Sequence, residues 1–231
     1  MRSTLLVLAT LVAIACCATS ALAQSLLYSF EDVNGAGPDG FFGLGATVSQ
    51  SATGATLGSN ALKYEIGVGG FVGARTETVV PAPLNNPPGV THVLFDLTVT
   101  DTYADTFANM GVTLFGHALN APGGAQFGHQ VQFLDEYPIA GLAPGTYTDQ
   151  RIDLDFSVGP YRPGESFNAI FGPDPTDLTV SSAFQFYINK NVLTPLTVYI
   201  DNVRVVVPEP ATGALFSLGA IALGLVARRR R

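Results

Sequence analysis

The chain has 231 residues, of which 47% are hydrophobic, and a formal net charge of −7. Residues 24–210 hold all 18 acidic residues but only 6 basic ones, so this central part carries a net charge of −12. Such a surface repels nucleic-acid phosphates and has no basic patch to overcome the repulsion, which argues against a nucleic-acid partner.

The first 23 residues have the pattern of a secretory signal peptide. Arg2 supplies a positive start, residues 5–15 are apolar, and Ala21 and Ala23 form a small-x-small cleavage pattern. The sequence therefore predicts a signal helix at residues 1–23, export through the Sec pathway, and cleavage after Ala23.

The only two cysteines, Cys16 and Cys17, lie inside this segment. An alternative interpretation attaches a lipid to Cys16, because residues 13–16 resemble a lipobox. In either case the exported chain is expected to form no disulfide between its own residues.

Residues 24–206 are expected to form one domain of antiparallel β-strands. Residues 93–99, 151–158 and 184–188 alternate apolar and polar side chains, which buries one face of a strand and leaves the other in solvent. Shorter strand candidates are residues 26–30, 61–66, 111–115, 127–134, 167–171 and 196–206. About ten strands separated by turn-rich links, without a helical pattern, predict an all-β sandwich.

The chain ends in an apolar segment followed by four arginines. The segment at residues 211–227 carries no charge and follows Pro208, Glu209 and Pro210; the arginines are Arg228, Arg229, Arg230 and Arg231. Its 17 residues lie at the lower limit for crossing a bilayer, and the arginines would hold the end on the cytoplasmic side. We therefore expect a single membrane helix at 211–227. A tail anchor that stays in the membrane is one interpretation.

The other interpretation comes from a resemblance. The motif, the apolar helix and the arginines resemble the PEP-CTERM sorting signal of Gram-negative bacteria, here at residues 207–231. The resemblance implies that an exosortase, a membrane-embedded enzyme similar to cysteine transpeptidases, recognises the tail and removes it, as in other C-terminal signals. It implies transient anchoring in the inner membrane, followed by a place at the cell surface or in the extracellular matrix.

The central domain resembles jelly-roll carbohydrate-binding modules of the galactose-binding-like type, through residues 28–31, 58–63 and 199–203. The resemblance implies two packed antiparallel sheets, one of them concave. It also implies a structural calcium ion between the first and last strands, with Glu31 and Asp201 as ligands. The alternative for Asp201 is a local hydrogen bond at the end of its strand.

Gln185, Tyr187 and Asn189 are candidates for glycan binding. They share one side of a predicted strand and combine an aromatic ring with amides, the groups that contact the faces and hydroxyls of sugars. Gln130 and Gln132 form a similar polar row. The chain has no tryptophan, and a solvated outer face would give the same pattern.

No motif of the central domain indicates catalysis. The three histidines lack the spacing of a zinc site. The neighbours Asp135 and Glu136 would point to opposite faces of an extended strand. Asp153 and Asp155 share a face, but Arg151 beside them predicts a surface ion pair.

The sequence therefore predicts a non-catalytic surface or matrix protein whose sandwich binds polysaccharide. Its expected partners are an exosortase, exopolysaccharide and, before processing, the membrane. A structural or adhesive envelope protein that makes only protein contacts is the second hypothesis, and a secreted hydrolase is the third.

Overall fold

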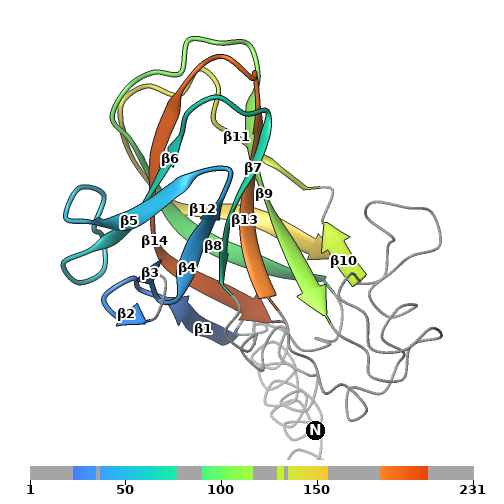
Figure 1. Cartoon of the computed structure of the whole chain (residues 1–231). Helices are drawn as coiled ribbons and strands as arrows, with labels where there is room; N and C mark the ends of the chain where they lie inside the picture. The colour runs from blue at the N-terminus through green and yellow to red at the C-terminus, as the bar shows by residue number, and fades with distance from the viewer. Residues whose placement is uncertain are drawn as a thin grey trace, which may run out of the picture. The chain divides into compact units, whose positions relative to one another are not determined.

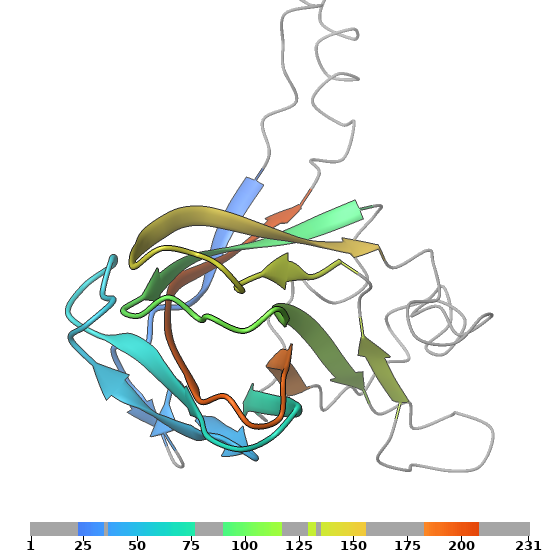
Figure 2. The ribbon, with the colours of Figure 1, turned by 90° about the horizontal axis from the view of Figure 1, so that it is seen from above.

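The computed structural model describes residues 23–34, 37–76, 90–116, 129–132, 135–155 and 183–207. These residues form two antiparallel sheets that pack face to face, as Figures 1 and 2 show. The predicted all-β sandwich is confirmed, and residues 24–206 form one compact unit. Within the described ranges no helix is long and apolar enough to span a bilayer. The helix predicted at residues 211–227 falls outside those ranges, and so does the helix predicted at residues 1–23 except for Ala23, which is the first residue of strand β1 (Ala23–Tyr28).

The first sheet has the strand order β12-β8-β14-β6-β5, with β1 also paired to β14. Its strands are β1 (Ala23–Tyr28), β5 (Thr47–Ser51), β6 (Ala61–Ile66), β8 (Val90–Val99), β12 (Gly145–Asp155) and β14 (Leu196–Val207). The long strand β14 lies between β8 and β6, so the C-terminal end of the domain forms the centre of this sheet.

The second sheet has the order β10-β9-β13-β7-β4, with β11 also paired to β9. Its strands are β4 (Phe41–Leu44), β7 (Phe71–Thr76), β9 (Ala108–Gly116), β10 (His129–Gln132), β11 (Tyr137–Pro138) and β13 (Ala183–Lys190). The short strands β2 (Val33–Asn34) and β3 (Gly37–Pro38) pair with each other alone.

Aromatic side chains fill the space between the sheets. The rings of Phe95 on β8 and Phe186 on β13 lie 5.9 Å apart, and those of Tyr28 on β1 and Phe184 on β13 lie 5.4 Å apart. Tyr28 also meets Phe41 of β4 edge to face at 4.9 Å. Burial of each such ring stabilises the fold by about 1.5–3 kcal/mol, so this cluster joins the two layers.

The strands predicted at residues 61–66, 93–99, 184–188 and 196–206 are confirmed as β6, β8, β13 and β14. The described part of the strand predicted at residues 151–158 lies in β12, which begins earlier, at Gly145. The strand predicted at residues 26–30 instead ends at Tyr28. Its next two N–H groups, of Ser29 and Phe30, donate to the carboxylate of Asp39, and Phe30 has a φ of 57°. The strand predicted at residues 167–171 lies outside the described ranges.

Candidate functional site

The outer face of the second sheet carries the residues predicted to bind glycan. Phe184 and Phe186 of β13 point into the core, so Gln185, Tyr187 and Asn189 lie on the opposite face of the strand. Tyr187 is fully buried, Gln185 is 4% exposed and Asn189 is half-buried. The predicted row therefore exists, but its aromatic member is itself covered.

Tyr187 lies flat on the sheet and supports a second ring. A Cβ atom added to Gly111 of β9 would stand 2.2 Å from the Tyr187 hydroxyl, so the glycine leaves room for the phenol. The hydroxyl donates to Glu136 at 2.9 Å, and Asn109 donates to the other oxygen of that carboxylate, also at 2.9 Å. The Tyr187 ring stacks on Phe71 with centroids 4.9 Å apart, and Phe71 is 49% exposed. Phe71 is therefore an accessible aromatic surface on a buried support.

Two polar atoms lie further along the same face. Gln185 pairs with Arg75 of β7 and with Thr113 of β9, and its amide lies over Gly73, where a Cβ atom would stand 2.7 Å from Cδ. Among the described residues, Gln185 Oε1 and Thr113 Oγ1 are buried and make no hydrogen bond. A buried polar atom without a partner costs about 1–3 kcal/mol. In β10, Gln132 pairs with Thr113.

A buried ammonium group fixes the loops at the end of the sheet where Phe71 lies. Lys190 is 2% exposed, and its Nζ donates to the carbonyl oxygens of Gly67, Asn191 and Thr194 at 3.1, 2.9 and 2.5 Å. Burial lowers the pKa of this lysine, and the negative charge of Asp105 opposes that effect. The Thr194 hydroxyl in turn donates to Asp105 at 2.6 Å. These hydrogen bonds connect the loop that leads into β7 to the loop between β13 and β14, and that loop to the one between β8 and β9.

The carboxylates predicted to bind calcium accept hydrogen bonds from the loop between β5 and β6. Glu31 Oε1 accepts from the N–H groups of residues 59 and 60, both at 2.7 Å, and Asp201 Oδ2 accepts from those of residues 56 and 57 at 2.6 and 2.7 Å. The N–H groups of residue 60 and then residue 59 lower the pKa of Glu31. The alternative predicted for Asp201 is also observed, because the Asn202 N–H donates to its Oδ1 at 2.6 Å.

These donors do not suit a calcium ion. Calcium needs six to eight oxygen ligands, whereas N–H groups direct their positive ends at both carboxylates. In the part of the chain that the structure describes, no group of three or more His, Cys, Asp or Glu side chains could hold a metal.

The carboxylates considered for catalysis make structural contacts. Glu136 binds Tyr187, while the neighbouring Asp135 accepts from the Asp153 N–H at 2.5 Å. The predicted ion pair between Arg151 and Asp153 is present. The carboxylates of Asp135, Glu136 and Asp153 thus make hydrogen bonds or ion pairs with other residues of the domain.

The residues predicted for signal cleavage and for sorting lie outside the described ranges, apart from Ala23. Ala21, the motif Pro208-Glu209-Pro210 and Arg228–Arg231 lie outside the described ranges, and Ala23 is the first residue of β1. Phe71, Glu136 and Thr113 were not predicted from the sequence. Phe71 is the first residue of a strand that contains Gly73. The sequence there shows no alternation of apolar and polar residues that would identify the outer face of the strand.

Comparison with known proteins identifies the C-terminal segment. Residues 206–231 match the PEP-CTERM protein-sorting motif, so the predicted sorting signal is confirmed. The motif implies export and processing by an exosortase. No curated protein matches the sequence.

Similar solved structures include two carbohydrate-binding modules. The CBM22-1 xylan-binding domain of Paenibacillus barcinonensis Xyn10C is 14% identical, with 83% of this chain and 99% of that chain covered and a TM-score of 0.47. The family 11 module of the Clostridium thermocellum cellulase Lic26A-Cel5E is also 14% identical, with 81% and 96% covered and a TM-score of 0.48. At these values neither similarity indicates a ligand or a function for this chain.

Proposed function

We propose that the protein is an exported, non-catalytic surface or matrix protein that binds polysaccharide through the outer face of its second sheet. The observation that carries the proposal is the half-exposed ring of Phe71, stacked on the buried Tyr187. The buried oxygens of Gln185 and Thr113, without hydrogen-bond partners in the described ranges, lie on the same face.

The chemistry of this face suits a sugar ring. A pyranose has an apolar C–H face that packs on an aromatic ring and hydroxyls that seek donors and acceptors around its edge. Phe71 of β7 pairs with Asn189 of β13, which pairs with Asn109 of β9. Two residues with amide side chains therefore lie in line with the aromatic ring across the sheet. The stack on Tyr187 holds the Phe71 ring in place, which reduces the entropy lost on binding.

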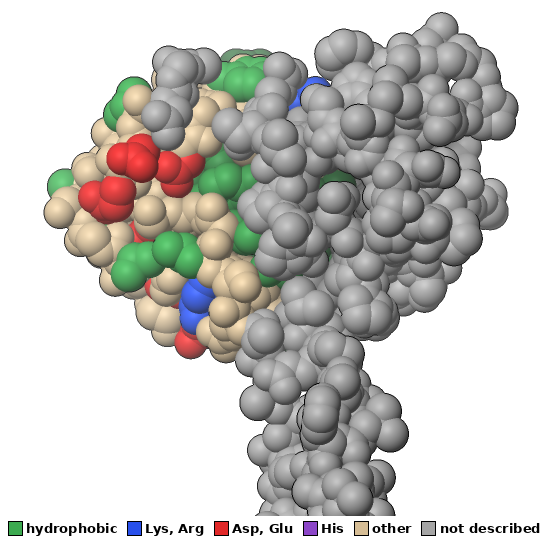
Figure 3. All heavy atoms as spheres, turned by 90° about the horizontal axis from the view of Figure 1, so that it is seen from below, with side chains coloured by type: hydrophobic (Ala, Val, Ile, Leu, Met, Phe, Trp, Pro, Cys, Tyr) green, Lys and Arg blue, Asp and Glu red, His purple; other side chains and the backbone are tan. Residues whose placement is uncertain are grey.

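The charge of the domain favours a neutral polymer. Residues 24–210 have a net charge of −12, and the face in Figure 3 shows acidic side chains in a group with few basic ones among the coloured atoms. An anionic polysaccharide would be repelled at low salt. The proposed ligand class is therefore a neutral polysaccharide of the cell's surroundings.

Affinity electrophoresis of residues 24–207 in gels containing neutral polysaccharides tests the proposal. The unmodified domain should be retarded by at least one polymer. Phe71→Ala should weaken binding about tenfold, which corresponds to about 1.4 kcal/mol, whereas Phe71→Tyr should retain it. Leu26→Ala, which changes an exposed residue of β1 in the other sheet, is the control and should have no effect. Absence of retardation across the panel, or equal retardation of Phe71→Ala, would contradict the proposal.

A second candidate function, adhesion through protein contacts, is favoured by a different observation. Val68, Val192 and Leu193 are 71%, 53% and 80% exposed, and their loops are joined by the bond from the Gly69 N–H to the Val192 carbonyl. Exposed apolar groups of this kind mark contact surfaces. This function would appear as self-association or partner capture that is unaffected by Phe71→Ala and by added polysaccharide.

A further inference from the structure

Two buried carboxylates face each other on the outer side of the first sheet. Asp96 of β8 pairs directly with Asp201 of β14, and the residues are 4% and 0% exposed. Like charges at opposed positions of neighbouring strands destabilise a sheet, and a buried carboxylate is costly unless it is hydrogen-bonded. The pair therefore needs either donors from the protein or a cation.

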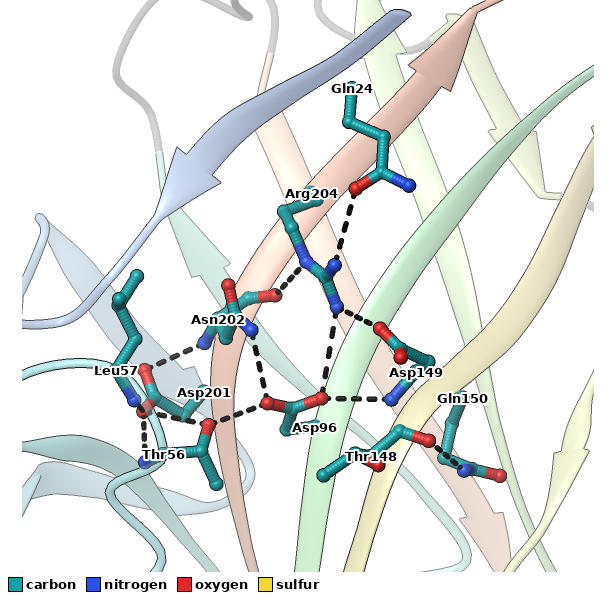
Figure 4. Close-up of polar contacts among 10 residues, drawn as sticks. All are labelled: Gln24, Thr56, Leu57, Asp96, Thr148, Asp149, Gln150, Asp201, Asn202 and Arg204. Carbon is teal, nitrogen blue, oxygen red and sulfur yellow. Dashed lines mark hydrogen bonds and ion pairs between the residues drawn. The ribbon is translucent and has the colours of Figure 1, made fainter. Parts of the chain in front are cut away.

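The loop between β5 and β6 supplies donors to both carboxylates, as Figure 4 shows. The hydroxyl of Thr56 lies 2.6 Å from Asp96 Oδ2 and 3.2 Å from Asp201 Oδ2, so it bridges the two groups. The N–H groups of Thr56 and Leu57 both donate to Asp201 Oδ2. Residues 56 and 57 thus donate hydrogen bonds to both carboxylates of the pair.

Two irregular positions in the neighbouring strands direct further donors at Asp96. Asn202 in β14 and Asp149 in β12 have φ values of 49° and 55°, and the strand register shifts at each of them. The Asp149 N–H donates to Asp96 Oδ1 at 2.8 Å, and the Asn202 side chain donates to Oδ2 at 3.1 Å. The guanidinium of Arg204 lies 3.8 Å from Asp96 Oδ1, so a protein cation balances part of the charge.

Glu31 holds the other end of the same loop. Its carboxylate accepts from the N–H groups of Ser59 and Asn60 and, at 3.3 Å, from the Asn60 side chain. Gly58 makes this approach possible, because it has a φ of 78° and an added Cβ atom would stand 2.5 Å from Glu31 Oε1. Carboxylates from three different places in the chain therefore bind residues 56–60.

We propose that this chain holds the β5–β6 loop with a carboxylate clasp, formed by Glu31, Asp96 and Asp201, in place of a structural calcium ion. The resemblance to galactose-binding-like modules implies calcium between the first and last strands. Here the protein's own N–H and O–H groups donate hydrogen bonds to the carboxylate oxygens that a cation would need as ligands. A calcium ion could bind only if the loop withdrew these donors and turned carbonyl oxygens inward. The inference does not depend on polysaccharide binding.

Thermal unfolding of the full chain in detergent, with excess calcium or with a chelator, tests this inference. The midpoint of unfolding should be the same in both conditions to within about 1 °C, because a ligand raises Tm only if it binds the folded state. A rise of several degrees with calcium would overturn the inference. So would tight binding of terbium, followed by its luminescence and displaced by calcium.

Variants of the loop separate the clasp from a metal site. Thr56→Val removes the bridging hydroxyl with little change of shape and should lower Tm by several degrees, equally with calcium and with chelator. Thr53→Val changes an exposed residue of the same loop and should leave Tm unchanged. Equal Tm values for the two variants, or rescue of Thr56→Val by calcium, would contradict the clasp. If Thr56→Val does not fold, the calcium titration of the unmodified chain still decides the question.

Discussion

At the scale of single residues, the burial of Tyr187 determines which aromatic ring of this face is exposed. Tyr187 was predicted as the aromatic contact of the site, yet it is fully buried, and the exposed ring is that of Phe71. Alternation in the sequence predicts the side of the strand on which Tyr187 lies. It cannot predict burial that depends on Gly111 and Glu136, which come from other parts of the chain.

Lys190→Met should destabilise the domain and loosen the loop before Phe71. The variant leaves three carbonyl groups of the loops without their charged donor. Since a hydrogen bond to a charged group contributes about 1.5–3 kcal/mol, we expect a loss of about 2 kcal/mol or more. Chemical denaturation followed by circular dichroism measures this change.

Lys63→Met is the matched control for this prediction. Lys63 forms an ion pair with Glu65 at 2.8 Å, but both side chains are partly exposed, at 29% and 40%. Such a surface pair contributes about 0–1 kcal/mol. A similar loss of stability in the two variants would show that the carbonyl contacts of Lys190 are not what stabilises the loops.

At the scale of elements, the strands β7, β13 and β9 together form the proposed site. Glycines on the two outer strands, Gly73 and Gly111, leave space for the side chains of Gln185 and Tyr187 on the strand between them. The strands with clear alternation could be predicted, but β4, β5 and β7 could not. They are short, and glycine interrupts both β4 and β7. The strands β4 and β7 are defined by pairing with segments further along the chain.

Gly111→Ala should displace the Tyr187 ring and break its bond to Glu136. The new methyl group would overlap the phenol at 2.2 Å, and overpacking of this kind costs about 1–3 kcal/mol. Polysaccharide binding should weaken as well, because the support of Phe71 moves. Thermal unfolding and affinity electrophoresis measure the two effects.

Gly145→Ala in β12 provides the comparison, since an added Cβ atom at that glycine meets nothing within 4 Å. It should leave both stability and binding unchanged. If Gly111→Ala behaved in the same way, the packing of Tyr187 over β9 would not be needed for the site.

At the scale of the whole molecule, the C-terminal segment carries a protein-sorting motif, and the domain before it carries the proposed binding face. The sorting motif at residues 206–231 could be predicted because its proline pair, apolar run and arginines are adjacent in sequence. The proposed binding face could be predicted only in part, because its residues come from β7, β9 and β13 and from Glu136 before β11, and they meet only in the folded sheet.

Hydrogen exchange of the domain, with and without a neutral polysaccharide that retards it, tests the central claim most directly. Amides that a ligand covers or stabilises exchange more slowly. We predict slower exchange in residues 71–76, 109–114 and 184–189 of the second sheet, with β12 of the first sheet unchanged. Protection confined to the first sheet, or no protection by any polysaccharide, would contradict the claim that this face binds glycan.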